Sequence, residues 1–147
     1  MKNSTAFFGK NPLISPYSSI DYYTNVVKLE NGGVFDPTST QDYFRLFMVP
    51  GMNHCFGGPG PHVFGNEYSS NIVINEPPTD DVNHHALKAL MAWVERGRAP
   101  EKIIATKYVN DTPAQGIAMQ RPICPYPRLP HYRGAGSVTD PASFACR

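Results

Sequence analysis

Several features that would assign a chain to a broad class are missing from this sequence. No apolar run approaches the roughly 20 residues that a membrane-spanning helix needs, and residues 1–10 lack the apolar region of a signal peptide. Charge is nearly balanced, with 13 Lys and Arg against 12 Asp and Glu, and no basic stripe that would bind nucleic acid is visible. We therefore expect neither a membrane nor a nucleic acid as partner, and no targeting signal within the chain itself.

Cysteine is also scarce, since only Cys55, Cys124 and Cys146 occur in 147 residues. The last two lie in a tail rich in Pro, Tyr and Gly that could hardly hold a shape without a cross-link. A disulfide there would close a loop of about twenty residues and contribute about 3 kcal/mol in the chain-entropy model. Cys55 would then have no partner cysteine within the chain, which indicates a disulfide to another chain or segment, or a free thiol. The alternative is three reduced cysteines in a cytosolic protein.

What is present favours one α/β domain. The apolar spacing predicts a helix that Ser18 or Ser19 caps and that ends at residues 31–33. Strands are predicted at residues 43–49 and 103–109. The first of these is apolar on both faces except for Arg45, which suits an interior strand of a mostly parallel sheet. We expect Arg45 to pair with a carboxylate at the edge of the sheet.

A second helix is predicted at residues 82–96, capped by Asp80 or Asp81 and ended by Gly97. Its first turn should carry His84 and His85 on the surface, about 100° apart, so that they cannot easily share one metal. The expected buried stripe of this helix consists of Ala86, Leu87, Leu90, Met91, Trp93 and Val94.

The Gly- and Pro-rich segment after the strand at 43–49 carries His54. An α/β enzyme presents a general base above its sheet on such a loop, and a half-cystine at Cys55 would fix the loop. The alternative is a loop histidine that backbone groups satisfy. A zinc cluster of His54, Cys55 and His62 fails because no second Cys or His follows at a suitable spacing, so no metal is predicted.

No G-x-S-x-G nucleophile elbow occurs in the chain. In α/β-hydrolases the triad follows the order Ser, Asp or Glu, His. A chain that holds only the histidine end of this order would be the last third of an enzyme.

Several uncommon sequence words in the right order resemble the tannase and feruloyl esterase family. They are FRLFMVPGMNHC at residues 44–55, GGPG at 57–60 and RPICPYP at 121–127, with PLISP at 12–16 upstream. The resemblance covers nearly everything from Asn11 to the end. It implies a secreted serine carboxylesterase with a Ser-Asp-His triad on an α/β-hydrolase fold, acting on esters of phenolic acids.

The resemblance also implies a role for individual residues. His54 would be the general base, and Cys55 would form a disulfide with the cysteine beside the serine, outside this chain. Cys124 and Cys146 would form the family's C-terminal disulfide. The family's calcium site would belong to its lid domain, which is not in this sequence, so no cofactor is expected here.

Two departures from the family bear on activity. The nucleophile region and the lid domain are absent, and Asn11 occupies the position of the catalytic aspartate. We therefore expect residues 1–147 to be an incomplete, C-terminal segment of an α/β-hydrolase domain, with a divergent lead-in at 1–10 and an irregular, disulfide-linked tail at 122–147. By itself it should not be an esterase, and its uncovered apolar surface should make it poorly soluble or self-associating. A non-catalytic binding remnant of the same fold is the alternative.

Overall fold

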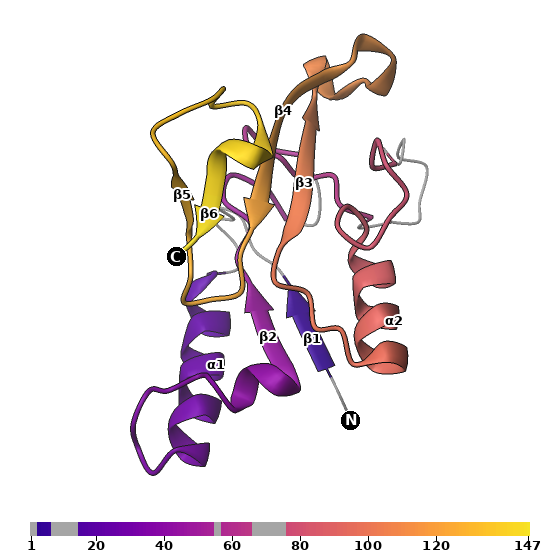
Figure 1. Ribbon diagram of the computed structural model, residues 1–147. Coiled ribbons are helices and arrows are strands. Elements are labelled where there is room, and N and C mark those ends of the chain that lie inside the picture. Colours follow the sequence, from indigo (N-terminus) through magenta and orange to yellow (C-terminus); the bar gives the residue numbers. More distant parts are fainter. Residues whose placement is uncertain (1–2, 7–14, 55–56, 66–75) are drawn as a thin grey trace.

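The computed structural model describes residues 3–6, 15–54, 57–65 and 76–147. Within these ranges it contains two α-helices and six β-strands (Figure 1). In chain order they are β1 (Asn3–Ala6), α1 (Tyr17–Glu30), β2 (Phe44–Phe47), α2 (Ala86–Arg96), β3 (Ile103–Tyr108), β4 (Ile117–Ile123), β5 (Pro130–Tyr132) and β6 (Phe144–Cys146).

Strand β2 occupies the interior position that its apolar sequence predicts. It pairs in parallel with β1 on one edge. On its other edge, Phe47 bridges Pro125, and the Tyr126 N–H donates to the Leu46 carbonyl at 2.7 Å. β2 therefore has hydrogen-bonded neighbours on both edges, which suits a strand whose four residues are all buried.

The two faces of β2 contact different helices, because successive strand residues point to opposite sides. Phe44 packs on Tyr23 of α1 with ring centroids 5.2 Å apart. Arg45, on the other face, lies 5.5 Å from the centre of the Trp93 ring of α2. The helices thus cover opposite sides of β1 and β2, as Figure 1 shows.

Arg45 pairs with a carboxylate, as its place in an apolar strand predicts. Its guanidinium lies 3.0 Å from a Glu101 carboxylate oxygen and donates to the Gln41 and Pro100 carbonyls at 2.8 Å each. A buried cation with this many partners does not carry the penalty of an unpaired charge.

The sheet that contains β2 is parallel in the described residues, as expected, but the other two strand pairs are not. Only β1 and β2 pair in parallel, whereas β3 with β4 and β5 with β6 are antiparallel. Residues 109–116 join β3 to β4, and this connection is too short for the crossover that a parallel pair requires.

Helix α1 agrees with its sequence pattern except at its start. Tyr23 and Val27 form its buried face, and it ends at Asn31, whose side chain donates to the Val27 carbonyl at 2.7 Å. Neither Ser18 nor Ser19 caps it. The N-cap position is Pro16, which offers no side-chain cap, and the Ser15 hydroxyl just before it accepts from the Tyr17 N–H at 3.3 Å.

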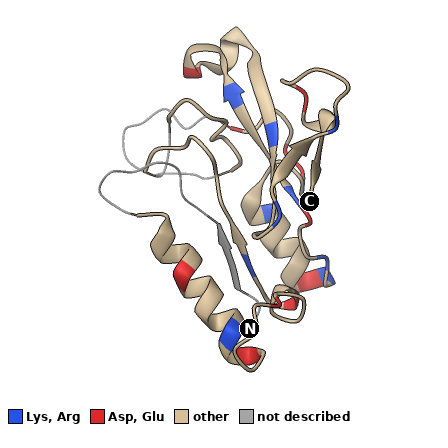
Figure 2. Ribbon diagram, turned by 90° about the vertical axis from the view of Figure 1, so that its left-hand side faces the viewer, with Lys and Arg blue, Asp and Glu red and all other residues tan. Residues whose placement is uncertain are grey.

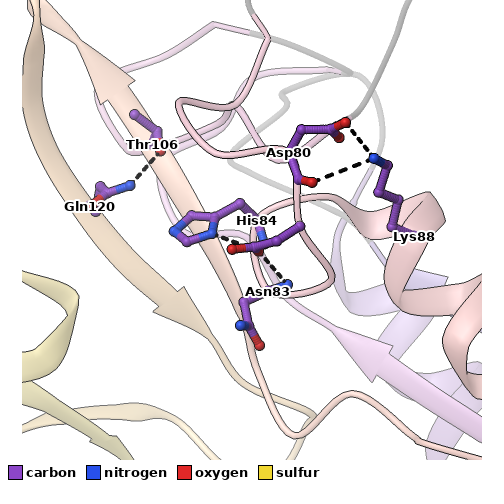
Figure 3. A network of polar contacts seen from close by, with 7 residues as sticks. Asp80, Asn83, His84, Lys88, Thr106 and Gln120 are labelled. Atoms are coloured by element: carbon purple, nitrogen blue, oxygen red, sulfur yellow. Dashed lines mark hydrogen bonds and ion pairs between the residues drawn. The ribbon is translucent and has the colours of Figure 1, made fainter.

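Helix α2 begins at Ala86, four residues later than predicted, because Asp81 closes a separate turn. The Asp81 carboxylate accepts from the Asn83 and His84 N–H groups at 2.8 and 3.0 Å and from the His84 ring at 2.9 Å. Figure 3 shows this turn, with the neighbouring contact between Asp80 and Lys88. His84 and His85 therefore precede the helix, and His85 is buried instead of lying on the surface.

The predicted buried stripe of α2 is confirmed for Trp93 and wrong for three of its six residues. Ala89, Ala92 and Trp93 face the core, whereas Leu87, Met91 and Val94 are 57%, 47% and 57% exposed. The helix carries apolar residues on two sides, and the side with small alanines can approach the core more closely. Gly97 ends the helix in the left-handed conformation, as expected.

The tail at 122–147 is cross-linked as expected but is not wholly irregular. Cys124 and Cys146 form a disulfide with 5.6 Å between their Cα atoms. Strands β5 and β6 pair between Pro130 and Cys146, and Leu129 and Arg147 exchange two backbone hydrogen bonds beyond them. The disulfide and the pairing of β5 with β6 together fix the position of the end of the tail.

Lysines and arginines are dispersed over strands and helices in Figure 2 and do not gather on one element. Neither described helix is both long and apolar enough to span a bilayer.

Candidate active site

The loop of residues 50–60 that carries His54, called the His54 loop below, follows β2. The structure describes all of it except residues 55 and 56. Val49 precedes its first turn and Met52 follows it, and both side chains are 1% exposed in the same core cluster as Phe47. The loop is therefore anchored in the core on both sides of the turn at Pro50 and Gly51.

Two backbone hydrogen bonds close the His54 loop on itself. The Asn53 N–H donates to the Gly57 carbonyl, and the Gly60 N–H donates to the Gly51 carbonyl, each at 3.0 Å. These bonds bring the two ends of the loop together around the histidine position. The described residues on the two sides of this loop are thus hydrogen-bonded to each other.

The glycines of this loop are required by close backbone contacts. A Cβ at Gly58, where φ is +103°, would lie 2.2 Å from the Gly51 carbonyl oxygen. A Cβ at Gly60 would lie 2.2 Å from the Pro50 carbonyl oxygen. No side chain fits at such distances, and Gly58 also needs a φ that L-residues avoid.

His54 lies on the closed loop, and its side chain is exposed. An imidazole that solvent and a reacting group can reach, on a backbone held by buried neighbours, is suited to take and return a proton. The catalytic role of His54 itself stays a prediction, as does the role of Cys55 and of Asn11, which lie outside the described residues.

Three polar residues beside the His54 loop were not singled out as a group from the sequence. Lys107, at the end of β3, donates to the Gly58 carbonyl at 2.7 Å and pairs with Asp111 at 2.6 Å. His62 is buried, with one ring nitrogen 3.1 Å from the Gly60 carbonyl and the other 3.6 Å from Asp111. We call Lys107, Asp111 and His62 the Lys107 cluster. The only sequence signal for it was a lysine inside an otherwise buried strand pattern.

No metal site forms within the described residues, where no group of three or more His, Cys, Asp and Glu side chains could hold an ion. His84 is engaged by Asp81, and His85 is packed against Gly65.

A cavity of about 230 Å³ opens beside the base of the His54 loop. It is lined by Val49, Pro50, Pro61, Ala105, Met119, Arg121, Pro122, Ile123, Pro130 and Phe144. The Arg121 guanidinium lies over the Phe144 ring at 4.4 Å. None of the lining residues is a nucleophile or a group that titrates near neutral pH. The cavity can accept a small apolar group, but it is not itself a site of reaction.

Comparison with solved structures identifies the kind of protein that shares this fold. An esterase from Aspergillus oryzae superimposes with a TM-score of 0.83 at 33% sequence identity, over 99% of this chain and 27% of that one. Feruloyl esterase B from the same organism superimposes with a TM-score of 0.79 at 28% identity. The likeness is consistent with an α/β-hydrolase-like fold of the esterase type.

The sequence comparisons agree with the structural ones. A family model described as tannase and feruloyl esterase matches residues 8–147, and the chain belongs to this family. It is 42% identical over 146 residues to an uncharacterized esterase of Xanthomonas campestris, which covers 93% of this chain and 24% of that protein. The chain spans about a quarter of the length of the curated relatives it matches.

Proposed function

We propose that this chain contributes the general base, His54, to a carboxylic ester hydrolase of tannase and feruloyl esterase type that acts on esters of phenolic acids. The observation that carries the proposal is the position of His54, exposed on a closed loop after the buried strand β2, inside the segment that the family model matches. Two named relatives point to ester substrates: a probable feruloyl esterase of Aspergillus flavus and a mono(2-hydroxyethyl) terephthalate hydrolase of Piscinibacter sakaiensis.

The proposed chemistry is acyl transfer through a serine. The His54 imidazole accepts the proton of the serine hydroxyl as its oxygen attacks the ester carbonyl, and it returns that proton to the departing alcohol. In the second half of the cycle it takes a proton from the water that attacks the acyl-enzyme carbonyl, and it gives that proton to the serine oxygen as the phenolic acid leaves. Both halves need an imidazole that stays in one place, and a loop anchored by Val49 and Met52 supplies it.

The other parts of the site would come from segments outside these 147 residues. They are the serine, the oxyanion hole, the acyl pocket and the lid with its calcium. Cys55 would then form a disulfide with the cysteine beside the serine and so join the His54 loop to the nucleophile. The complete enzyme would be secreted, which suits the disulfide between Cys124 and Cys146.

A second candidate is a non-catalytic binding remnant, and Asn11 favours it. An asparagine can accept a hydrogen bond from the imidazole but cannot stabilise the imidazolium with a charge. In serine proteases the same exchange lowers kcat about 10⁴-fold. The two candidates thus differ in what a charge at position 11 would do.

The decisive experiment grafts this chain into the Xanthomonas campestris esterase in place of the segment it matches. Turnover of methyl ferulate and methyl gallate is measured for the graft as it stands, with Asn11→Asp, and with Asn11→Asp plus His54→Ala. We expect Asn11→Asp to raise kcat up to about 10⁴-fold and His54→Ala to remove the gain. A folded Asn11→Asp graft without turnover, or one that tolerates His54→Ala, would overturn the proposal.

A further inference from the structure

The His54 loop is held from outside by a lysine that belongs to another strand. The Lys107 ammonium donates to the Gly58 carbonyl at 2.7 Å, across 49 positions of sequence. Its side chain is only 16% exposed. A lysine ammonium is normally left in water, so its burial against a backbone carbonyl indicates that the contact has a purpose in fixing that carbonyl.

His62 holds the same turn at a second point. Its Nδ1 lies 3.1 Å from the Gly60 carbonyl, and because a carbonyl only accepts, this nitrogen carries the hydrogen. The two side chains therefore bind the carbonyls of Gly58 and Gly60, on either side of Pro59. A turn held at both of these carbonyls cannot rotate without breaking one contact.

Asp111 orients the lysine by an ion pair and lies beside His62. Its carboxylate lies 2.6 Å from the Lys107 ammonium and 3.6 Å from the second ring nitrogen of His62. Asn110 and Asp111 have φ values of +50° and +54°, in the left-handed region that residues other than glycine rarely occupy. Contacts of the Asn110 side chain with Gln115 and of its carbonyl with the Thr112 hydroxyl hold this strained turn. Strain of this kind persists where the surrounding structure requires a particular direction of a side chain.

The platform beneath Lys107 is itself rigid. Thr106, the preceding residue, is fully buried and forms an antiparallel bridge with Val63 that includes hydrogen bonds of 2.8 and 3.0 Å. Gln120 of β4 donates to its hydroxyl at 3.0 Å, which Figure 3 also shows. The position of the Lys107 backbone is thus set by β3, β4 and the segment that follows the His54 loop.

From these contacts we infer that Lys107, fixed by Asp111 and assisted by His62, is a positioning residue that holds the His54 loop in its catalytic geometry. The role in catalysis rests on the proposed function of His54, whereas the role in fixing the loop does not. Among the described residues, the Lys107 ammonium contacts the Gly58 carbonyl and Asp111, so it acts through the loop and not on the substrate.

The first test needs no activity and uses the 147-residue chain. Amide hydrogen exchange is measured by NMR at Asn53 and Gly60, whose N–H groups close the loop, in the native chain and in Lys107→Met, Lys107→Arg and Lys102→Met. Lys102 is exposed and lies just before β3, so its loss is the matched control. Lys107→Met should speed exchange at both amides at least about tenfold while the amides of β3 stay protected. Lys107→Arg should restore part of the protection, and Lys102→Met should change nothing.

Equal protection in the native chain and in Lys107→Met would overturn the inference. If Lys107→Met loosens β3 as well, Asp111→Asn decides, because it leaves the lysine in place and removes only the charge that orients it. It should speed exchange at Asn53 and Gly60 without affecting β3, and unchanged exchange there would also overturn the inference.

The second test uses the Asn11→Asp graft. Lys107→Met should lower kcat up to about 100-fold, the effect of a displacement near 1 Å, and leave KM within about twofold, because the substrate contacts are made elsewhere. If Lys107 had only a structural role, its loss would change kcat and KM together or would change neither. A graft without activity in every form would refute the proposed function of His54 while the exchange result still decides the role of Lys107.

Discussion

Replacing Gly58 with Ala tests whether the closed form of the His54 loop depends on its glycines. A Cβ at this position would lie 2.2 Å from the Gly51 carbonyl oxygen and 2.9 Å from the Asn53 nitrogen. Both are backbone atoms, so no side-chain rotation can relieve the contact. Gly57 is the matched control, because its φ is also positive at +69° but the nearest atom is 4.0 Å away.

The structure sets the expected magnitudes of the two changes. Gly57→Ala should reduce the free energy of unfolding by roughly 1–2 kcal/mol, the cost of a left-handed backbone for an L-residue. Gly58→Ala incurs the same cost and adds roughly 1–3 kcal/mol for overpacking, a total of about 2–5 kcal/mol. If the loop detaches instead of accommodating the new side chain, the loss of unfolding free energy is smaller. The amide of Gly60 is then no longer protected from exchange.

Urea unfolding followed by fluorescence of Trp93, the single tryptophan and 1% exposed, measures both variants. With a typical slope of 1–3 kcal/mol per molar urea, a loss of about 3 kcal/mol lowers the midpoint by about 1–3 M. Hydrogen exchange at Gly60 reports detachment. If Gly57→Ala and Gly58→Ala have equal midpoints and equal Gly60 protection, the close contact described here does not govern the loop.

Three further predictions concern other parts of the chain. Replacing Cys124 and Cys146 with Ser should lower the free energy of unfolding by about 3 kcal/mol, which urea titration with and without reductant measures; equal stability in both would contradict it. A hydrogen bond from Arg128 lowers the pKa of Glu101 below its ordinary 4.5, so this carboxylate stabilises the fold at neutral pH and loses that effect as the pH falls below 4.5. Glu101→Gln should therefore flatten the loss of Tm on acidification, and an unchanged slope would refute this. Met91→Glu, on the exposed apolar side of α2, should reduce self-association in sedimentation velocity, whereas the native chain should associate as its concentration rises.

The parts of the fold that follow from local pattern could be predicted from the sequence. Tyr23 and Val27 recur at helical spacing, and the apolar run around Leu46 indicated a buried strand; both lie in one core cluster. These predictions rest on periodicity, which depends only on residues near one another in the chain.

The buried side of α2 could not be predicted in the same way. Large apolar residues on one side, such as Leu87 and Met91, outweighed the alanines on the other in the sequence pattern. Close approach of a helix to a core favours small side chains, and the partners that decide this, such as Phe64 next to Ala86, come from a distant segment. Periodicity detects that a helix has an apolar side, but not which of two sides is covered.

The same distinction between local and distant contacts applies to the candidate site. His54 could be found from its sequence neighbourhood, because the Gly and Pro residues around it and the strand before it are local. The Lys107 cluster could not, because the contact of Lys107 with Gly58 joins positions 49 residues apart. Its charge pair with Asp111 also depends on a left-handed backbone at that residue, which no local rule requires of aspartate.

The contacts around the His54 loop bear on the choice between an enzyme segment and a binding remnant. A binding surface tolerates a loop histidine that moves, since its affinity is spread over many contacts. General base catalysis does not, because a shift near 1 Å can cost about 100-fold in rate. Here a half-buried lysine and a buried histidine bind two carbonyls of one short turn, and Asp111 pairs with the lysine. These contacts fix the position of the loop. A fixed loop is needed if His54 transfers protons. Asn11 is the residue that favours the binding remnant. Restoring a carboxylate with Asn11→Asp should therefore restore turnover if the chain is an esterase segment that lacks only this group, and should not if the fold is a binding remnant.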